Sequence, residues 1–213
     1  MRKPQPGTAR GLSQWWWALF VVLALLDVVF TLVDASWDWR HASALQAWML
    51  VQALLATVAV AALAVAFRDF AYGIVAVVFV ALVLEDWLQL LSSARLELRS
   101  AVHELLPGAG PAVARLVTPD PIDLVILLGA AGVVAVALWA SRPRHWNHIL
   151  WLSGFLAIGF LFGGVLDLYN DYNYTRAGVL VEELGEAVAI SAALAYLVGI
   201  ASNLARGRPV DRV

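Results

Sequence analysis

Six long apolar segments dominate this sequence and restrict what the chain can fold into. Each is close to the roughly 20 residues that an α-helix needs to cross about 30 Å of hydrocarbon. The segments cover approximately residues 15–36, 44–66, 70–91, 122–140, 148–168 and 179–204. Most connections between them are short, so neighbouring helices are expected to pack antiparallel. The sequence therefore predicts an all-α, polytopic transmembrane helical bundle with six spans, forming a single domain over residues 1–213.

The overall composition agrees with this fold class. Of the 213 residues, 62% are hydrophobic and 14% are charged, whereas soluble domains carry about 45–50% apolar and about 25% charged residues. A water-soluble chain of this length could not bury so much apolar surface, so the lipid bilayer is its expected solvent and partner. The net charge of −2 gives no indication of a nucleic-acid partner. The absence of Cys excludes disulfides, thiol catalysis and Cys-ligated metals.

The distribution of basic residues sets the expected orientation. Cytoplasmic segments of membrane proteins carry an excess of Lys and Arg. A cytoplasmic N-terminus places five basic residues outside and nine inside, namely Arg2, Lys3, Arg10, Arg68, Arg142, Arg144, Arg206, Arg208 and Arg212. Both termini are therefore expected in the cytoplasm. One Lys against thirteen Arg suggests a GC-rich bacterial genome and hence the bacterial cytoplasmic (inner) membrane.

Two segments need separate interpretation. The first apolar segment is longer than the 7–15 apolar residues of a signal peptide, and Asp27 interrupts it, so we expect it to remain as a span. The long loop between the third and fourth spans has apolar residues at helical spacing and polar residues on the opposite face. This pattern predicts a short amphipathic helix over residues 93–106, lying in the outer membrane interface.

Acidic residues gather on the outer side of this topology. Only Asp69 and Asp211 lie on the cytoplasmic side, and the other fourteen acids lie in outer loops or in the helices. In the first span, Asp27, Thr31 and Asp34 have i, i+4, i+7 spacing and form one polar stripe. The third span carries adjacent acids near its outer end, and the sixth span opens with Glu-Glu-x-x-Glu.

Depth in the membrane singles out some of these acids. A charge at the centre of a span costs about 2.5–3.5 kcal/mol, so such residues usually face the bundle interior and find partners. We therefore expect Glu85, Asp86 and Glu186 to lie close together where the third and sixth spans meet. Mutual repulsion would be relieved by protons, by a cation, or by Arg and His side chains. Asp27, near mid-membrane, is expected to be a proton relay or a buried, protonated or hydrogen-bonded acid.

Oxygen ligands of this kind favour a divalent cation such as Ca²⁺, Mg²⁺ or Mn²⁺, and a histidine would tilt the preference toward Zn²⁺ or Fe²⁺. The predicted ligands are Glu85, Asp86, Asp167, Glu186 and His103. Asp34, Glu182 and Glu183 are interpreted as solvated helix ends. His145 and His148 have a spacing that suits a metal, but they lie at the basic cytoplasmic interface. Gly159 and Gly163 form a small-xxx-small pattern that permits close helix approach.

No motif identifies a reaction, a catalytic residue or a substrate. Three functions remain open. The first is a membrane protein with an acidic cluster that binds cations or protons at the extracytoplasmic side. The second is a small proton- or cation-coupled transporter, because intramembrane carboxylates are typical proton relays. The third is a membrane-embedded, metal-dependent hydrolase that acts on a lipid-like substrate. A membrane-protein partner or a homo-oligomer is compatible with all three.

Overall fold

The computed structural model describes residues 15–36, 44–88, 129, 132–166 and 175–207. For residues 82–88, 144 and 164–166 it describes the backbone only. Regular structure in these ranges is helical throughout, and no strand occurs in them. The predicted all-α class is therefore confirmed for the described part of the chain.

The helices follow the predicted segments closely. α1 covers Trp15–Ser36, α2 covers Ala44–Phe67 and α3 covers Phe70–Leu88. Residues 132–140 are helical and lead into the short helix η1, Pro143–His145. α7 covers Trp146–Phe160 and continues as the π-helical segment η2, Leu161–Leu166, and α9 covers Arg176–Ala205. The sixth helix begins three residues earlier than expected because Thr175 caps it, accepting a hydrogen bond from the Gly178 amide at 3.0 Å.

Four of these helices are long and apolar enough to cross a membrane: α1, α2, the continuous Trp146–Gly163 stretch and α9. Phe70–Ala81 of α3 is a shorter apolar helix. These helices indicate an integral membrane protein. The fourth predicted span and the outer end of the third lie partly outside the described residues, and the interfacial helix over residues 93–106 lies wholly outside them. Six spans therefore remain a prediction.

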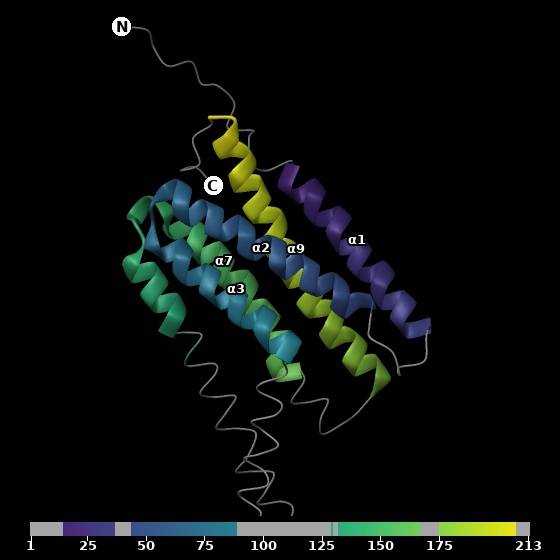
Figure 1. The fold of residues 1–213 in the computed structure, drawn as a ribbon. Coiled ribbons are helices and arrows are strands. Elements are labelled where there is room, and N and C mark those ends of the chain that lie inside the picture. The colour runs from purple at the N-terminus through teal and green to yellow at the C-terminus, as the bar shows by residue number, and fades with distance from the viewer. Residues whose placement is uncertain (1–14, 37–43, 89–128, 130–131, 167–174, 208–213) are drawn as a thin grey trace, which may run out of the picture.

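α9 is the central helix of the bundle (Figure 1). It packs against α1, α2, α7 and η2, while α3 packs against α2 and touches α7. Its middle section is rich in buried small residues, among them Ala189, Ala192, Ala193 and Ala195, which let the neighbouring backbones come close. α1 is the most peripheral of the four long helices, and it exposes large apolar side chains such as Leu25 and Leu32, as a lipid-facing helix would.

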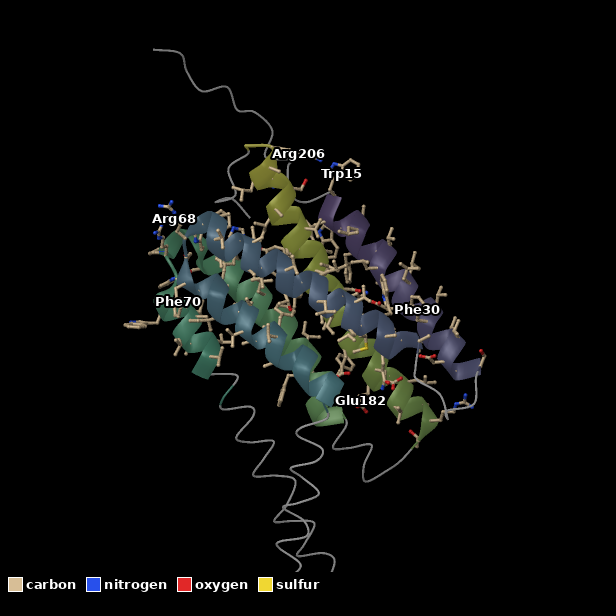
Figure 2. All side chains as sticks on the ribbon, in the orientation of Figure 1. Trp15, Phe30, Arg68, Phe70, Glu182 and Arg206 are labelled. Carbon is tan, nitrogen blue, oxygen red and sulfur yellow. The ribbon has the colours of Figure 1, made fainter. Side chains whose placement is uncertain are left out.

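The two ends of the bundle differ in charge. Trp15, Arg68 and Arg206 lie toward one end, which we call the basic end, and Glu182 lies toward the other, the acidic end (Figure 2). Consecutive helices run in alternating directions between them (Figure 1). The start of α1 and the end of α9 therefore share one end of the molecule. Which end faces the cytoplasm remains a prediction from the basic residues.

Candidate functional site

Asp27 lies in the middle of α1, and its side chain faces the interior of the bundle. It is twelve residues after Trp15, which is about 18 Å along a helix. Its side chain has no exposed surface, and Thr31 one turn later is buried on the same face. The Thr31 hydroxyl donates to the Asp27 backbone carbonyl at 2.8 Å. The polar stripe predicted for the first span therefore points inward at these two positions.

Three neutral side chains hold the Asp27 carboxylate. Oδ1 accepts hydrogen bonds from Trp48 Nε1 at 2.8 Å and from Gln52 Nε2 at 3.0 Å. Oδ2 accepts from Ser191 Oγ at 2.7 Å, and Gln52 Nε2 also donates to Ser191 Oγ at 2.8 Å. Trp48 and Gln52 lie on α2, and Ser191 lies on α9. This set of four residues, called the Asp27 network below, joins three helices through one carboxylate.

The electrostatics of the network are unusual for the interior of a membrane. A charge at the centre of a span costs about 2.5–3.5 kcal/mol even on insertion scales. Within the described residues, every donor to the Asp27 carboxylate is neutral. In the described part of the chain, these donors therefore leave the Asp27 carboxyl group without a cationic partner.

Gln52 is incompletely bonded within this network. Its side chain is completely buried, and its Oε1 has no hydrogen-bond partner in the described part of the chain. A buried acceptor left without a donor costs about 1–3 kcal/mol. The sequence did not predict that Gln52, Trp48 or Ser191 would be part of a functional site. Their helical positions carry no charge, and only the packing of α2 and α9 against α1 shows that they converge on Asp27.

Apolar layers separate the Asp27 network from both ends of the bundle. The larger layer lies toward the basic end and includes Leu23, Val60, Tyr196 and Ile200. The smaller layer lies toward the acidic end and contains the buried residues Leu45, Met49 and Ala187, with Phe30, Trp48 and Ile190 packed against them. Among the described residues, Asp27 therefore has apolar side chains on both sides of it along the bundle.

Asp34 has a structural role at the acidic end. Its two carboxylate oxygens accept hydrogen bonds from the backbone amides of Ala44, at 3.0 Å, and Leu45, at 2.8 Å. These amides open α2, so Asp34 of α1 caps the positive end of the next helix. Arg176 donates to the Ala35 carbonyl and joins the end of α1 to the start of α9. The interpretation of Asp34 as a solvated helix end thus missed its capping contacts.

The predicted metal ligands are only partly described. Glu186 lies on α9, and its carboxylate packs directly against Gly163 of η2. Only the backbone is described for Glu85 and Asp86, and Asp167 and His103 lie outside the described residues. The main neighbour of α3, which carries Glu85 and Asp86, is α2. Among the described side chains, no three His, Asp or Glu residues are close enough to hold a metal ion. That Glu85, Asp86 and Glu186 lie close together and share a cation therefore stays a prediction.

A second polar cluster lies at the basic end. Asp69, between α2 and α3, accepts from the Ala71 amide at 3.1 Å and the Arg142 amide at 3.3 Å, and its Oδ2 lies 2.6 Å from His145 Nδ1. Burial alone would raise the pKa of Asp69, but the hydrogen bonds from His145 and the two amides outweigh it, and the pKa lies below its usual value. The cluster ties the turn after α2 to the segment before α7.

His145 and His148, whose spacing suits a metal, have different partners. His145 pairs with Asp69, and His148 Nδ1 lies 2.7 Å from the Tyr196 hydroxyl on α9. Their ring centres are 6.5 Å apart. Both rings are buried and act as polar contacts between helices.

Asp27 is a buried acid at mid-length of α1 that bonds to side chains of two other helices, and we take the Asp27 network as the candidate functional site. Comparison of the chain with protein-family models, curated proteins and solved structures gave no match. Function is therefore inferred from the geometry of this site itself.

Proposed function

We propose that this protein is a six-span integral membrane protein, with both termini in the cytoplasm, that binds and releases a proton at Asp27. One observation carries the proposal: a carboxylate at mid-depth of the bundle is completely buried and held by three neutral donors. Intramembrane carboxylates are rare, costly and typical of proton relays. A proton is the smallest ligand that makes this site neutral.

The contacts of the site favour a proton over a metal ion. Ca²⁺ takes six to eight oxygen ligands, and Mg²⁺ requires near-octahedral coordination. Around Asp27 the side chains touch one another at 2.7–3.0 Å, and two of the three donors to the carboxylate are N–H groups that would repel a cation at Oδ1. A proton needs no cavity and forms a covalent bond to a carboxylate oxygen that is already in place.

The activity that this site fits best is that of a small proton-coupled carrier. The smaller apolar layer lies between Asp27 and the acidic end, where Asp34, Glu182, Glu183 and Glu186 are found. We propose that protons enter from this end and that the predicted outer acids Glu85, Asp86 and Asp167, with His103, belong to the same entrance. The expected location is the bacterial cytoplasmic membrane, with the acidic end facing out.

A carbodiimide that partitions into the bilayer tests the proposal directly, because such reagents modify protonated carboxyl groups in apolar surroundings. The full chain in lipid vesicles is treated with dicyclohexylcarbodiimide over a range of pH, and the modified residue is located by mass spectrometry. We expect an adduct at Asp27 that increases as the pH falls and disappears in Asp27→Asn. Asp69→Asn, which removes a buried acid at the basic end, should leave the adduct unchanged.

Two results would contradict the proposal. The first is the absence of an Asp27 adduct at every pH. The second is protection of Asp27 by Na⁺, Mg²⁺ or Ca²⁺ at constant pH, which would assign the site to a metal cation. Proton flux into dye-loaded vesicles under an imposed membrane potential then tests the carrier activity, and Asp27→Asn should abolish it.

A further inference from the structure

The side-chain amide of Gln52 does not use all of its hydrogen-bonding groups in the observed state of the site. Nε2 donates to both Asp27 Oδ1, at 3.0 Å, and Ser191 Oγ, at 2.8 Å. Oε1, on the same carbon atom, is buried without a donor among the described residues. Buried carbonyl oxygens of this kind are uncommon in folded proteins. The imbalance indicates a second state of the site in which a donor reaches Oε1.

Protonation of Asp27 creates such a donor. An ionised carboxylate only accepts hydrogen bonds, which matches the three donors that surround Asp27. A protonated carboxyl carries one O–H group that needs an acceptor. The two groups that contact Oδ1, Trp48 Nε1 and Gln52 Nε2, are both donors and cannot accept this proton. A half-turn of the Gln52 amide exchanges Nε2 and Oε1 and places an acceptor beside Oδ1.

We propose that Gln52 is a proton-linked switch, whose amide presents Nε2 to the ionised Asp27 carboxylate and Oε1 to the protonated carboxyl. This inference rests on the proposed function of Asp27. In the step, a proton from water forms the Oδ1–H bond and no other covalent bond changes. The amide is planar and its two ends have nearly the same size, so the half-turn fits the space that Gln52 already occupies.

Ser191 can follow the same change. In the ionised state Ser191 Oγ accepts from Gln52 Nε2 and donates its one proton to Asp27 Oδ2. In the protonated state the Ser191 hydroxyl turns from Asp27 Oδ2 and donates to Gln52 Oε1. The three residues lie on α1, α2 and α9. One proton therefore reverses the hydrogen bonds that Gln52 of α2 makes with Asp27 of α1 and with Ser191 of α9.

Asp27 is the charged group that bonds to Gln52, so its charge is the one that controls the proposed switch. α2 carries no charged residue from Ala44 to Phe67. The other titratable or charged groups lie elsewhere along the helices around Gln52, and on α9 Glu186 and Tyr196 are each five residues from Ser191, about 7.5 Å along the helix. Among the described side chains of α1 and α9 they are Asp34, Arg176, Glu182, Glu183, Glu186 and Tyr196. The acids of α3, Glu85 and Asp86, are described by their backbone alone.

Infrared difference spectroscopy of the full chain in lipid bilayers tests the switch. The five glutamines are labelled with ¹³C at the side-chain carbonyl, and spectra at low and high pH are subtracted. We expect a carboxylic-acid band from Asp27 and a labelled amide band that change at the same midpoint pH. Gln52→Met, which is close in size, should remove the amide band and move the acid band to higher frequency. Gln46→Met, at an exposed position of the same helix, should do neither.

The possible results separate the switch from the proton site. An Asp27 acid band with no accompanying glutamine band, or with a glutamine band that survives in Gln52→Met, overturns the switch and leaves the proton site intact. The absence of any acid band that Asp27→Asn removes overturns the proposed function. The wild-type spectrum already shows whether a glutamine responds to pH, and Asp27→Asn must remove that response, so the test does not depend on the folding of Gln52→Met.

Discussion

At the scale of single residues, two buried aspartates are stabilised in different ways. Asp27 lies in the middle of the bundle and depends on neutral side-chain donors from other helices. Asp69 lies between helices and combines backbone amides with a histidine. The second arrangement lowers the pKa of Asp69 and favours its ionised form.

The network predicts measurable energetic coupling between Asp27 and Ser191. Interhelical hydrogen bonds in membranes contribute about 0.6 kcal/mol on average and up to about 1.7 kcal/mol. Asp27→Ala removes three of them and should lower the free energy of unfolding by about 2 kcal/mol. Ser191→Ala should cost less than this, and the two losses should not add in the double variant. Unfolding in mixed micelles measures both.

Thr57→Ala provides the control for this cycle. The Thr57 hydroxyl bonds to the Ala53 carbonyl of its own helix, so its loss should add to that of Asp27→Ala. Additive losses for Asp27→Ala and Ser191→Ala would show that the bond at 2.7 Å does not contribute to stability.

The lowered pKa of Asp69 predicts how the free energy of unfolding depends on pH. Because the pKa of Asp69 is lowered in the folded protein, its stabilising contribution is complete above the ordinary value of 3.8. The contribution is lost as the pH falls through that value toward the lower folded pKa. Asp69→Asn should therefore be less stable than the wild type near neutral pH, by about 1–2 kcal/mol. The difference should shrink toward about pH 3, as thermal unfolding would measure. Parallel pH profiles for the two proteins would contradict this assignment.

At the scale of elements, the close approach of η2 and α9 depends on glycine. A Cβ on Gly163 would lie 1.4 Å from Glu186 Oε1, and a Cβ on Gly185 would lie 2.2 Å from the Phe162 ring. At Gly159, by contrast, the nearest atom is the Ala189 Cβ at an ordinary 3.5 Å. The predicted small-residue contact of the fifth span is thus confirmed, and Gly163 and Gly185 are the two positions of this contact where a Cβ would overlap a neighbouring side chain.

Alanine substitutions at Gly163 and Gly159 should therefore differ. Gly163→Ala displaces the Glu186 carboxylate, which is the flexible end of a side chain, and should destabilise the protein by about 1 kcal/mol, the low end of the usual cost of overpacking. Gly159→Ala fits the available space and should be neutral or slightly stabilising, because alanine favours the helix. Thermal unfolding in detergent compares them. If Glu186→Ala fails to restore stability to Gly163→Ala, the clash with Glu186 is not the cause.

At the scale of the whole molecule, the alternating direction of the helices gives the bundle one end rich in basic residues and one end rich in acidic residues. The basic end carries Arg68, Arg142 and Arg206, and the acidic end carries Asp34, Glu182 and Glu183. This polarity follows the expected excess of basic residues in the cytoplasm. In the proposed orientation, the apolar layer of Leu45, Met49 and Ala187 lies on the outer side of Asp27.

Cysteine labelling tests the orientation, because the native chain has no Cys. In intact cells, Gln5→Cys and Asp211→Cys should resist a membrane-impermeant thiol reagent, whereas Gly110→Cys should react. All three should react after the cells are permeabilised. Labelling of Gln5→Cys in intact cells would reverse the orientation and would make the acidic end cytoplasmic.

The sequence by itself determined the helices and their order. Apolar runs of about 20 residues require helices that satisfy their own backbone hydrogen bonds in lipid, and this rule is local. The bounds of α1 agreed with the prediction, and those of α2 agreed within one residue. The sequence also drew attention to Asp27, whose side chain is fully buried in the structure, because the cost of a mid-membrane charge follows from its position in the span alone.

Tertiary structure decided which residues share the site. The sequence placed the acids by depth and grouped Glu85, Asp86 and Glu186, but depth does not say which helices are neighbours. Packing of α1 against α2 and α9 brings Trp48, Gln52 and Ser191 to Asp27. A neutral polar residue on an apolar helix cannot be recognised from the sequence as part of a site, because its bonding partner lies on another helix. The partner of a buried charge depends on the relative rotation of helices, which arises from side-chain packing across the whole bundle.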